Sequence, residues 1–545
     1  MKYMAGWRVR AYFTRGILAI TISGLTACGG GSGGNDSGAV ASNDRQYILT
    51  AVQHLDSAST AEPSFDVQMV DPRSSTALGL HGVASATTIM QGRLGTDGTT
   101  LEISPHHLLY LQNGLLRRIS LGLSDHAPQP VTLQVDGVCR VSSSRTTLAD
   151  PDHALFNIMR PGLDNLCNTM DDLTQLVRVS PDGSLAIIAE GVRKGYLLLG
   201  DNTPDTPLSW LTLAYANTTS AEAVVERLDS TRPGVSPIDF TALPDAPMRL
   251  IGRSTDALVL QGQQRLWLLD LKTDQPSVLS LSELATPQLR GENWSAFGHH
   301  DGTFLLLHQV SSLPDLRWDI HAVQPGNAGS RLIAQGQGIG LPQLGATALL
   351  LQQIDNTPAN RISLLGLDGQ PGPTLMNVDI DSLYPRWLGD DAILIESGNT
   401  STPSVGIYDG TGQQVFSVSN ARNLGFRLTT PFARTDLPRD EPQLLYLTGL
   451  PDGQPYYGTD LWLYDRSSGQ RRHLGRLPDP ASLGKPGTLS MSVSGTAGAS
   501  GVLSVMRDST TTDHVSGAVT QQHDTLAIYT FDTRQADSLR LVQPQ

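Results

Sequence analysis

The chain has 545 residues, and its 38 Lys and Arg against 52 Asp and Glu give a formal net charge of −14. An acidic chain without a basic block is a poor nucleic-acid binder, because the neutralisation of phosphates needs clustered Lys and Arg. Hydrophobic residues make up 39% of the sequence and fall in alternating runs, which excludes an intrinsically disordered chain. The length corresponds to roughly three or four domains, or to one large repetitive domain.

The amino terminus has the pattern of an export signal. It begins with the basic residues Lys2, Arg8, Arg10 and Arg15, and the apolar segment GILAITISGL follows at residues 16–25. This segment is about half of the ~20 residues that a membrane-spanning helix needs, which favours a cleaved signal peptide. It ends in Leu25-Thr26-Ala27-Cys28, which resembles the lipobox of bacterial lipoproteins. The resemblance implies a lipoprotein signal peptide over residues 1–27 and acylation, palmitate included, of Cys28; a secretory signal with a chance cysteine is the alternative.

Residues 28–44 follow as a Gly/Ser-rich stretch, with GGGSGGNDSG at 29–38. This composition is typical of a flexible tether. Each acyl methylene buried in the bilayer contributes about 0.8 kcal/mol to membrane binding. The several acyl chains of a lipoprotein anchor therefore keep the protein in the membrane effectively permanently. Gly29 rather than Asp follows Cys28, and the enterobacterial sorting rule then favours the outer membrane. We therefore expect a lipid-anchored protein of the cell envelope, on its periplasmic or surface face.

Two further cysteines, Cys139 and Cys167, complete the set of three. An exported protein matures in an oxidising setting, so we expect these two to form a disulfide; two buried thiols are the alternative. In the chain-entropy model such a bridge stabilises the fold by roughly 3 kcal/mol.

From residue 45 onward the sequence has an all-β pattern, in which short strands alternate with Gly, Pro, Asp and Asn, and helical periodicity is nearly absent. One kind of strand alternates apolar residues and commonly ends in Asp before a turn, as at 67–71, 266–270, 405–409 and 461–465. A second kind is continuously apolar, as at 257–260, 304–307, 348–351, 392–395 and 444–447. A run that is apolar on both faces fits a strand packed between two neighbouring sheets.

These units recur roughly every 40 to 60 residues, which is the spacing of propeller blades. The pattern resembles the TolB-like and WD-like repeats of exported β-propellers, and Ser180-Pro181-Asp182-Gly183 is the most specific match. The resemblance implies an all-β fold, a β-propeller of about 7–10 four-stranded blades over residues 45–545, with a single ring favoured. A sheet that is apolar on both faces is stable only when others cover it. A row of separate β-sandwich domains is the alternative.

The segment RPGLDNLCNTMDD at 160–172 is the most distinctive stretch of the chain. Its oxygen-bearing residues are the kind of hard ligand that calcium requires, although their spacing is not that of an EF-hand. The candidate calcium ligands are Asp164, Asn165, Asn168, Asp171 and Asp172. The alternative is a surface loop that the disulfide pins, with these residues serving as turn formers.

Catalytic spacings are otherwise missing: H-E-x-x-H, C-x-x-C and the phosphate-binding glycine loop do not occur. The one G-x-S-x-G lies at 30–34 within the tether, where a nucleophile elbow has no strand before it and no helix after it. Strand ends, rather than a metal or catalytic site, are favoured for the adjacent histidines at 106–107 and 299–300. The same holds for the carboxylates Asp379 and Asp381. Tryptophans fall about once per repeat and fit a core between blades: Trp210, Trp267, Trp294, Trp318, Trp387 and Trp462.

These observations favour a binding or scaffold module for an envelope protein or polysaccharide, with no identifiable catalytic machinery and no cofactor beyond calcium. Two alternatives stay open. One is a propeller enzyme, either a glycan lyase or hydrolase or a quinone-dependent oxidoreductase, although fold alone carries no function. The other is an accessory factor in outer-membrane protein assembly, by resemblance to the propeller lipoproteins of that machinery.

Overall fold

The computed structural model of this chain describes residues that all lie within one compact unit, Ser42–Gln545. They are residues 46–54, 64–94, 101–124, 127–143, 147–148, 155–167, 169, 171–180, 182–192, 194–199, 209–215, 223–229, 235–237, 247–253, 257–262, 265–270, 275–279, 294–298, 304–310, 318–323, 330–337, 343–344, 348–354, 360–378, 383–388, 392–397, 403–424, 443–449, 459–477, 488–495, 500–512 and 519–544. Cys28 and the predicted signal and tether segments lie outside them.

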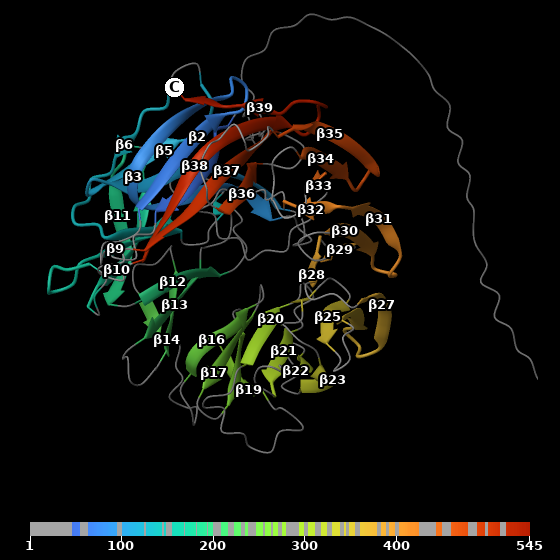
Figure 1. Ribbon diagram of the computed structural model, residues 1–545. Helices are drawn as coiled ribbons and strands as arrows, with labels where there is room; N and C mark the ends of the chain where they lie inside the picture. Colours follow the sequence, from blue (N-terminus) through green and yellow to red (C-terminus); the bar gives the residue numbers. More distant parts are fainter. Residues whose placement is uncertain are drawn as a thin grey trace, which may run out of the picture. The chain divides into compact units, whose positions relative to one another are not determined.

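Every regular element among the described residues is a β-strand, and the strands form nine hydrogen-bonded sheets (Figure 1). The first sheet has eight strands: β1 (Ile48–His54), β2 (Ser64–Asp71), β3 (Thr76–Leu94), β4 (Leu101–Gln112), β5 (Leu115–Ser120), β6 (Val131–Thr132), β8 (Thr147–Leu148) and β40 (Gln543–Pro544).

Each of the other eight sheets is a four-stranded meander, in which consecutive strands pair antiparallel. In chain order their strands are β7 (Arg140–Ser143), β9 (Leu155–Arg160), β10 (Leu173–Val179) and β11 (Leu185–Val192); β12 (Lys194–Leu199), β13 (Ser209–Tyr215), β14 (Ala223–Asp229) and β15 (Val235–Pro237); β16 (Pro247–Arg253), β17 (Ala257–Gly262), β18 (Leu266–Asp270) and β19 (Gln275–Leu279); β20 (Trp294–Gly298), β21 (Phe304–Gln309), β22 (Trp318–Val323) and β23 (Ser330–Gln337); β24 (Gln343–Leu344), β25 (Ala348–Ile354), β26 (Asn360–Gly366) and β27 (Pro371–Val378); β28 (Leu383–Trp387), β29 (Ala392–Ser397), β30 (Ser404–Asp409) and β31 (Gln414–Ser419); β32 (Ala421–Asn423), β33 (Gln443–Thr448), β34 (Asp460–Asp465) and β35 (Gln470–Arg476); and β36 (Thr488–Gly495), β37 (Ser500–Thr512), β38 (Val519–Asp532) and β39 (Arg540–Leu541).

The first sheet is two blades that share one long strand. Residues 76–83 of β3 pair with β2, and residues 83–94 pair with β4. Gly82 lies at the change of partner with φ of 64°, a left-handed conformation that glycine adopts without strain. One half therefore contains β1, β2, the start of β3 and β40, and the other contains the end of β3 with β4, β5, β6 and the short strand β8. Together with the eight meanders, the described residues form ten blades, numbered 1 to 10 in chain order, and each has four strands except blade 2, to which β8 adds a fifth.

The continuously apolar strands are packed on both faces, as their pattern predicts. In β33, Leu444 and Tyr446 pack against blade 8, whereas Leu445 and Leu447 pack against blade 10. The same division holds in β21, β25, β29 and β4, where successive residues enter the cores of opposite neighbours. Because neighbouring residues of a strand point to opposite faces, each such strand contributes to two cores. Burying one leucine in this way stabilises the fold by roughly 1.5–3 kcal/mol.

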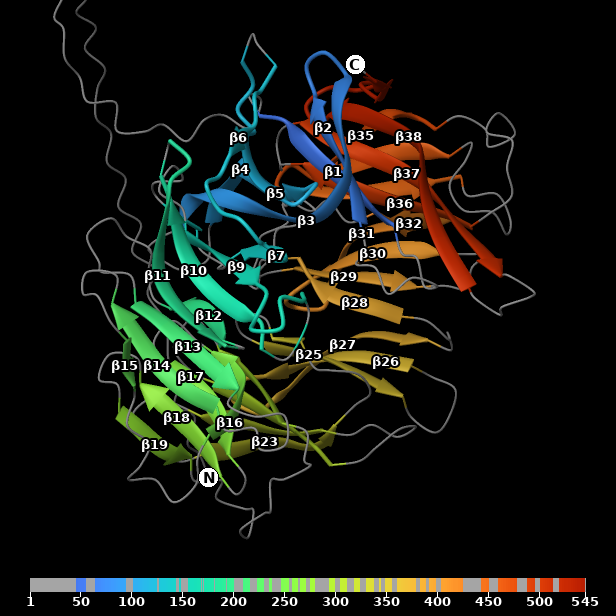
Figure 2. The same ribbon diagram turned by 90° about the vertical axis from the view of Figure 1, so that its left-hand side faces the viewer.

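The packing continues from blade to blade and returns to its start. Apolar cores join blades 1 to 2 and 2 to 3, then each successive pair from 5 to 10. Strand contacts β10–β12 and β14–β16 join blades 3, 4 and 5. Strand β1 contacts β37 and β38, and Figure 2 shows β1 beside β37.

The cycle closes between blades 10 and 1, where Ile48, Val70 and Ala77 share a core with Val502 and Val542. The last strand, β40, leaves blade 10 and pairs parallel with β3 in blade 1. The protein is thus an all-β propeller of four-stranded blades, as predicted, and the row of independent sandwiches is excluded. Figure 2 shows one departure from uniform blades, the hairpin of β37 and β38, which extends beyond its neighbours.

Candidate functional site

Aspartates at strand ends hold the tight turns of the blades. Asp409, which ends β30, accepts hydrogen bonds from the Thr411 hydroxyl at 2.6 Å and from the backbone N–H groups of Thr411 and Gln413 at 2.9 Å. Asp465 accepts from the Ser467 hydroxyl at 2.6 Å. The hydroxyl donors lower the pKa of both carboxyl groups. The aspartates that end strands in the sequence pattern therefore have a structural role: their carboxylates stabilise Asx-type turns.

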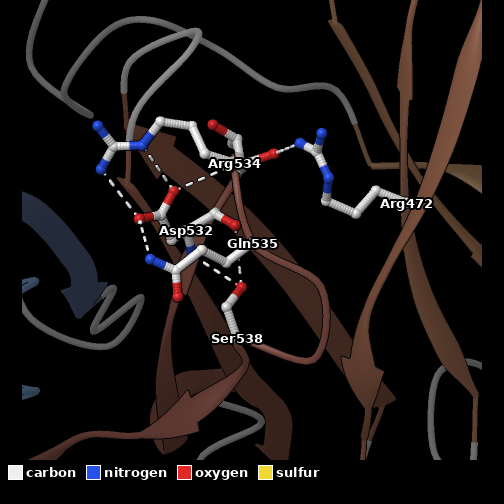
Figure 3. A network of polar contacts seen from close by, with 6 residues as sticks. Arg472, Asp532, Arg534, Gln535 and Ser538 are labelled. Atoms are coloured by element: carbon white, nitrogen blue, oxygen red, sulfur yellow. Dashed lines mark hydrogen bonds and ion pairs between the residues drawn. The ribbon is translucent and has the colours of Figure 1, made fainter.

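Asp532 holds a larger turn after β38, and Figure 3 shows the polar network around it. Its carboxylate accepts from Nε and Nη2 of Arg534 at 3.0 and 2.9 Å and from the Gln535 side-chain amide at 3.4 Å. The Ser538 hydroxyl accepts from the Asp532 N–H at 3.0 Å and donates to its carbonyl at 2.9 Å. The hydrogen bond from Arg534 lowers the pKa of Asp532. We call residues 532–539, with their partners on β34 and β35, the clasp.

The clasp joins blade 10 to blade 9. Arg472 of β35 donates to the carbonyl of Thr533, and Figure 3 shows its side chain reaching across to the turn. The N–H groups of Asp537 and Leu539 donate to the carbonyls of His473 and Leu474 at 3.0 and 2.8 Å. The segment that leads to the closing strand β40 is therefore attached to the preceding blade by both backbone and side chains.

His473 lies in the clasp between two carboxylates. Its Nδ1 is 2.6 Å from Oδ1 of Asp537, and its Nε2 is 3.4 Å from Oδ1 of Asp460. Nη1 of Arg476 is 3.9 Å from Oδ2 of Asp460, and the indole of Trp462 lies 5.0 Å from the imidazole. Both ring nitrogens face carboxylate oxygens, so in this arrangement neither is directed at a substrate. The group fits a structural polar contact between two blades.

The predicted disulfide is present. Cys139 and Cys167 are joined with a Cα–Cα distance of 5.5 Å, and the buried Cys139 donates its N–H to the carbonyl of Met159 at 2.7 Å. The bridge fixes the described part of the connection between β9 and β10, residues 161–167, 169, 171 and 172, which we call the stapled loop. Three of its aspartates lie around one hydroxyl, since Oγ1 of Thr169 is 3.4, 2.8 and 3.0 Å from oxygens of Asp164, Asp171 and Asp172.

The stapled loop contains four of the five predicted calcium ligands within the described residues, and Asn168 lies outside them. Asn165 has φ of 57°, a turn conformation that asparagine tolerates. The hydrogen bond from Thr169 lowers the pKa of Asp171. Across the described part of the chain, no three His, Cys, Asp or Glu side chains are placed so that they could hold a metal ion. The loop geometry has the turn-forming character of the alternative interpretation, and calcium binding stays a prediction.

A further carboxyl of interest is Glu396 of β29. Burial raises its pKa, and the nearby Arg422 and Arg386 partly offset this. A raised carboxyl pKa is a property of general acids, but it also arises in structural ion networks. In the sheet, Glu396 lies opposite Tyr384 of β28 and Val405 of β30.

The remaining predicted positions divide into core and undescribed residues. Trp267 and Trp294 are fully buried and Trp318 is buried, as predicted for a core between blades, and Trp294 stacks on His308 with ring centroids 4.3 Å apart. His107 is buried and its ring contacts His106 edge-on. Four predicted residues lie outside the described part: His299, His300, Asp379 and Asp381.

Sequence reasoning missed the clasp residues and the exposed leucines of the stapled loop, Leu163 and Leu166. The clasp brings together residues more than sixty positions apart, as with His473 and Asp537 at a separation of 64. No local spacing marks such a pair. For the leucines a signal was present, because each stands in a turn-rich loop where a buried strand is not expected.

The described residues include no helix long and apolar enough to cross a membrane. The chain matches no protein-family model, and no curated protein is significantly similar to it.

Solved structures resemble the chain only distantly. A eukaryotic initiation factor is 8% identical over 90% of this chain and 99% of its own, with a TM-score of 0.40. The β-propeller domain of the trilobed protease from Pyrococcus furiosus is 12% identical over 61% and 96%, with a TM-score of 0.30. TolB from Acinetobacter baumannii is 10% identical over 60% and 78%, with a TM-score of 0.24.

Proposed function

We propose that this protein is a lipid-anchored binding module of the cell envelope, which uses its propeller to hold a protein or polymer partner. The anchor is Cys28, the tether is residues 28–44, and the propeller extends over residues 45–545. The L-T-A-C sequence and the Gly/Ser stretch support the anchor, and Gly29 supports the outer membrane.

One observation carries the binding role. The stapled loop is fixed by a disulfide and by its own hydrogen bonds, and yet it exposes Leu163 and Leu166 to solvent. By contrast, the clasp bonds to the neighbouring blade through Arg472, His473 and the N–H groups of Asp537 and Leu539. A rigid loop that exposes apolar side chains is an element suited to contact with another molecule.

The alternatives raised by the sequence lack a comparable observation among the described residues. The imidazole of His473 faces two carboxylates, which hold it within the clasp. Nothing in the described residues points specifically to glycan cleavage, to a quinone or to outer-membrane protein assembly.

Two measurements test the proposal. Cells producing the full chain are fed an alkyne-labelled palmitate; we expect label and membrane retention in the native protein and neither in Cys28→Ser. The full chain is then purified from detergent-solubilised membranes, and we expect the same protein or polysaccharide to be recovered in repeated preparations. Repeated recovery of the chain alone would contradict the binding role, and a Cys28→Ser variant that stays in the membrane would contradict the anchor.

A further inference from the structure

Among the large apolar side chains of the described residues, Leu163 at the tip of the stapled loop is the most exposed. Leu163 is 96% exposed and Leu166 is 61% exposed, whereas the leucines of the blades are mostly buried. Single exposed leucines are common on protein surfaces. Leu163 and Leu166 stand three positions apart on a loop held from both sides, and we call these two exposed side chains the knob.

The loop that carries this knob has little freedom to collapse. Cys167 is bonded to Cys139, which is only 3% exposed and directly precedes β7, the first strand of blade 3. A Cβ on Gly162 would lie 2.3 Å from the carbonyl oxygen of Asp171, so the two ends of the loop approach as closely as glycine permits. The N–H groups of Asp164 and Leu166 donate to Asp171 at 3.2 Å and to Asp164 at 2.9 Å.

The disulfide and the hydrogen bonds fix the loop, but they do not bury Leu163 and Leu166. A disulfide of this span stabilises the fold by about 3 kcal/mol, but the side chains at the loop tip remain in water. Fixing a loop in its bound conformation lowers the entropy lost when a partner covers it. The arrangement therefore favours a partner that buries Leu163 and Leu166.

The charge of the loop limits what that partner is. Residues 161–172 contain Asp164, Asp171 and Asp172 and no Lys or Arg. Asp164 is exposed beside the leucines, and the hydrogen bond from Thr169 favours the ionised form of Asp171 through its lowered pKa. An anionic lipid surface repels such a loop, whereas Lys and Arg side chains around an apolar pocket attract it.

We infer that the stapled loop docks Leu163 and Leu166 into an apolar pocket of a partner protein, and that Lys or Arg side chains rim this pocket and face Asp164. This inference rests on the proposed binding function and names the surface and the class of its partner.

Site-specific photo-crosslinking in the producing cells tests this inference. Full-length chain carries p-benzoylphenylalanine in place of Leu163 or, as a matched control, of Val415, which is 50% exposed on β31 of blade 8. We expect an adduct with a protein from position 163 and none from position 415. Mass spectrometry of the adduct should place the crosslink in an apolar pocket with Lys or Arg at its rim.

Charge dependence separates docking from chance proximity. Asp164→Lys should lower the adduct yield about tenfold, because like charges then face each other. The same loss is expected for the unaltered loop in about 0.5 M NaCl, where the screening length is about 4 Å. Replacing a Lys at the rim of the identified partner's pocket by Glu should restore the adduct yield of the Asp164→Lys variant, because opposite charges then face each other again.

Three outcomes would overturn the inference: an adduct with lipid, no adduct at position 163, or a yield indifferent to charge and salt. Its failure is distinguishable from failure of the binding function itself. If membrane preparations still recover a partner and Leu163→Ser with Leu166→Ser leaves that recovery unchanged, only the assignment of the surface is wrong. If no partner is recovered at all, the proposed function has failed.

Discussion

The clasp and the stapled loop are both organised around aspartates, but they place their apolar side chains differently. In the clasp, the N–H groups of Asp537 and Leu539 bond to the strand that also carries the fully buried Leu474. In the stapled loop, the polar groups bond mainly to one another, and Leu163 stays in water. The first arrangement holds two blades together, whereas the second holds a surface in one shape.

A matched pair of leucine substitutions gives the largest contrast. Leu474→Ala removes a side chain with 0% exposure from the core between blades 9 and 10, and should lower the free energy of unfolding by about 2–5 kcal/mol. Leu163→Ala should change it by less than about 0.5 kcal/mol, because the side chain is already in water. Chemical denaturation measures both. Equal losses in the two variants would contradict the contrast between core and knob.

Removal of the disulfide should have the next largest effect. The double variant Cys139→Ser with Cys167→Ser should lose about 3 kcal/mol, since the unfolded chain regains the entropy of an open loop. The adduct from position 163 should also weaken, because the loop then has to be ordered on binding. A variant with native stability and an undiminished adduct yield would contradict both roles of the disulfide, stabilising the fold and ordering the stapled loop.

Two arginines of the clasp should differ in their contributions. Arg472→Ala leaves the fully buried Thr533 without its donor from blade 9 and should cost about 1–3 kcal/mol. Arg534→Ala removes an ion pair within one turn, whose arginine is half exposed, and should cost about 1 kcal/mol or less. Thermal unfolding of the two variants side by side gives the comparison. The reverse order would mean that the turn, rather than the contact between blades, stabilises the clasp.

Acid should weaken the clasp through Asp532. The hydrogen bond from Arg534 lowers the folded-state pKa of this carboxyl below that of the unfolded chain. The stabilisation is therefore present above the unfolded pKa of about 3.9 and is lost as the pH falls through the folded pKa. Asp532→Asn should show a shallower fall of Tm between about pH 5 and pH 2 than the native chain. Identical slopes would exclude this carboxyl as a source of acid sensitivity.

The sequence predicted the blades because each continuously apolar strand serves two cores, a pattern that Leu444, Leu445, Tyr446 and Leu447 repeat within four positions. It also predicted the disulfide and the strand-ending aspartates, which are local or depend on only two residues. The exact number of blades could not be predicted from the sequence, because the long strand β3 belongs to two blades and changes partner at Val83.

Long-range polar contacts were beyond the reach of the sequence for a different reason. The hydroxyls of Thr50 and Ser504 lie 2.6 Å apart across the closure although 454 positions separate them. Ser and Thr are common in strands and in turns, so neither residue marks its partner. His473 and Asp537 are likewise ordinary residues until the fold places blade 10 against blade 9.

The central claim is that the blades form one closed cycle that the carboxyl terminus completes. Hydrogen–deuterium exchange of a chain lacking residues 540–545 tests this claim most directly, because the deletion removes β39, Val542 and the closing strand β40 and leaves β1, β2 and β3 of blade 1 in the chain. We predict faster exchange in β1 and β2 as well as in β37 and β38, since these strands share the core that is lost. Native exchange rates in β1 and β2 after the deletion would contradict the closed cycle.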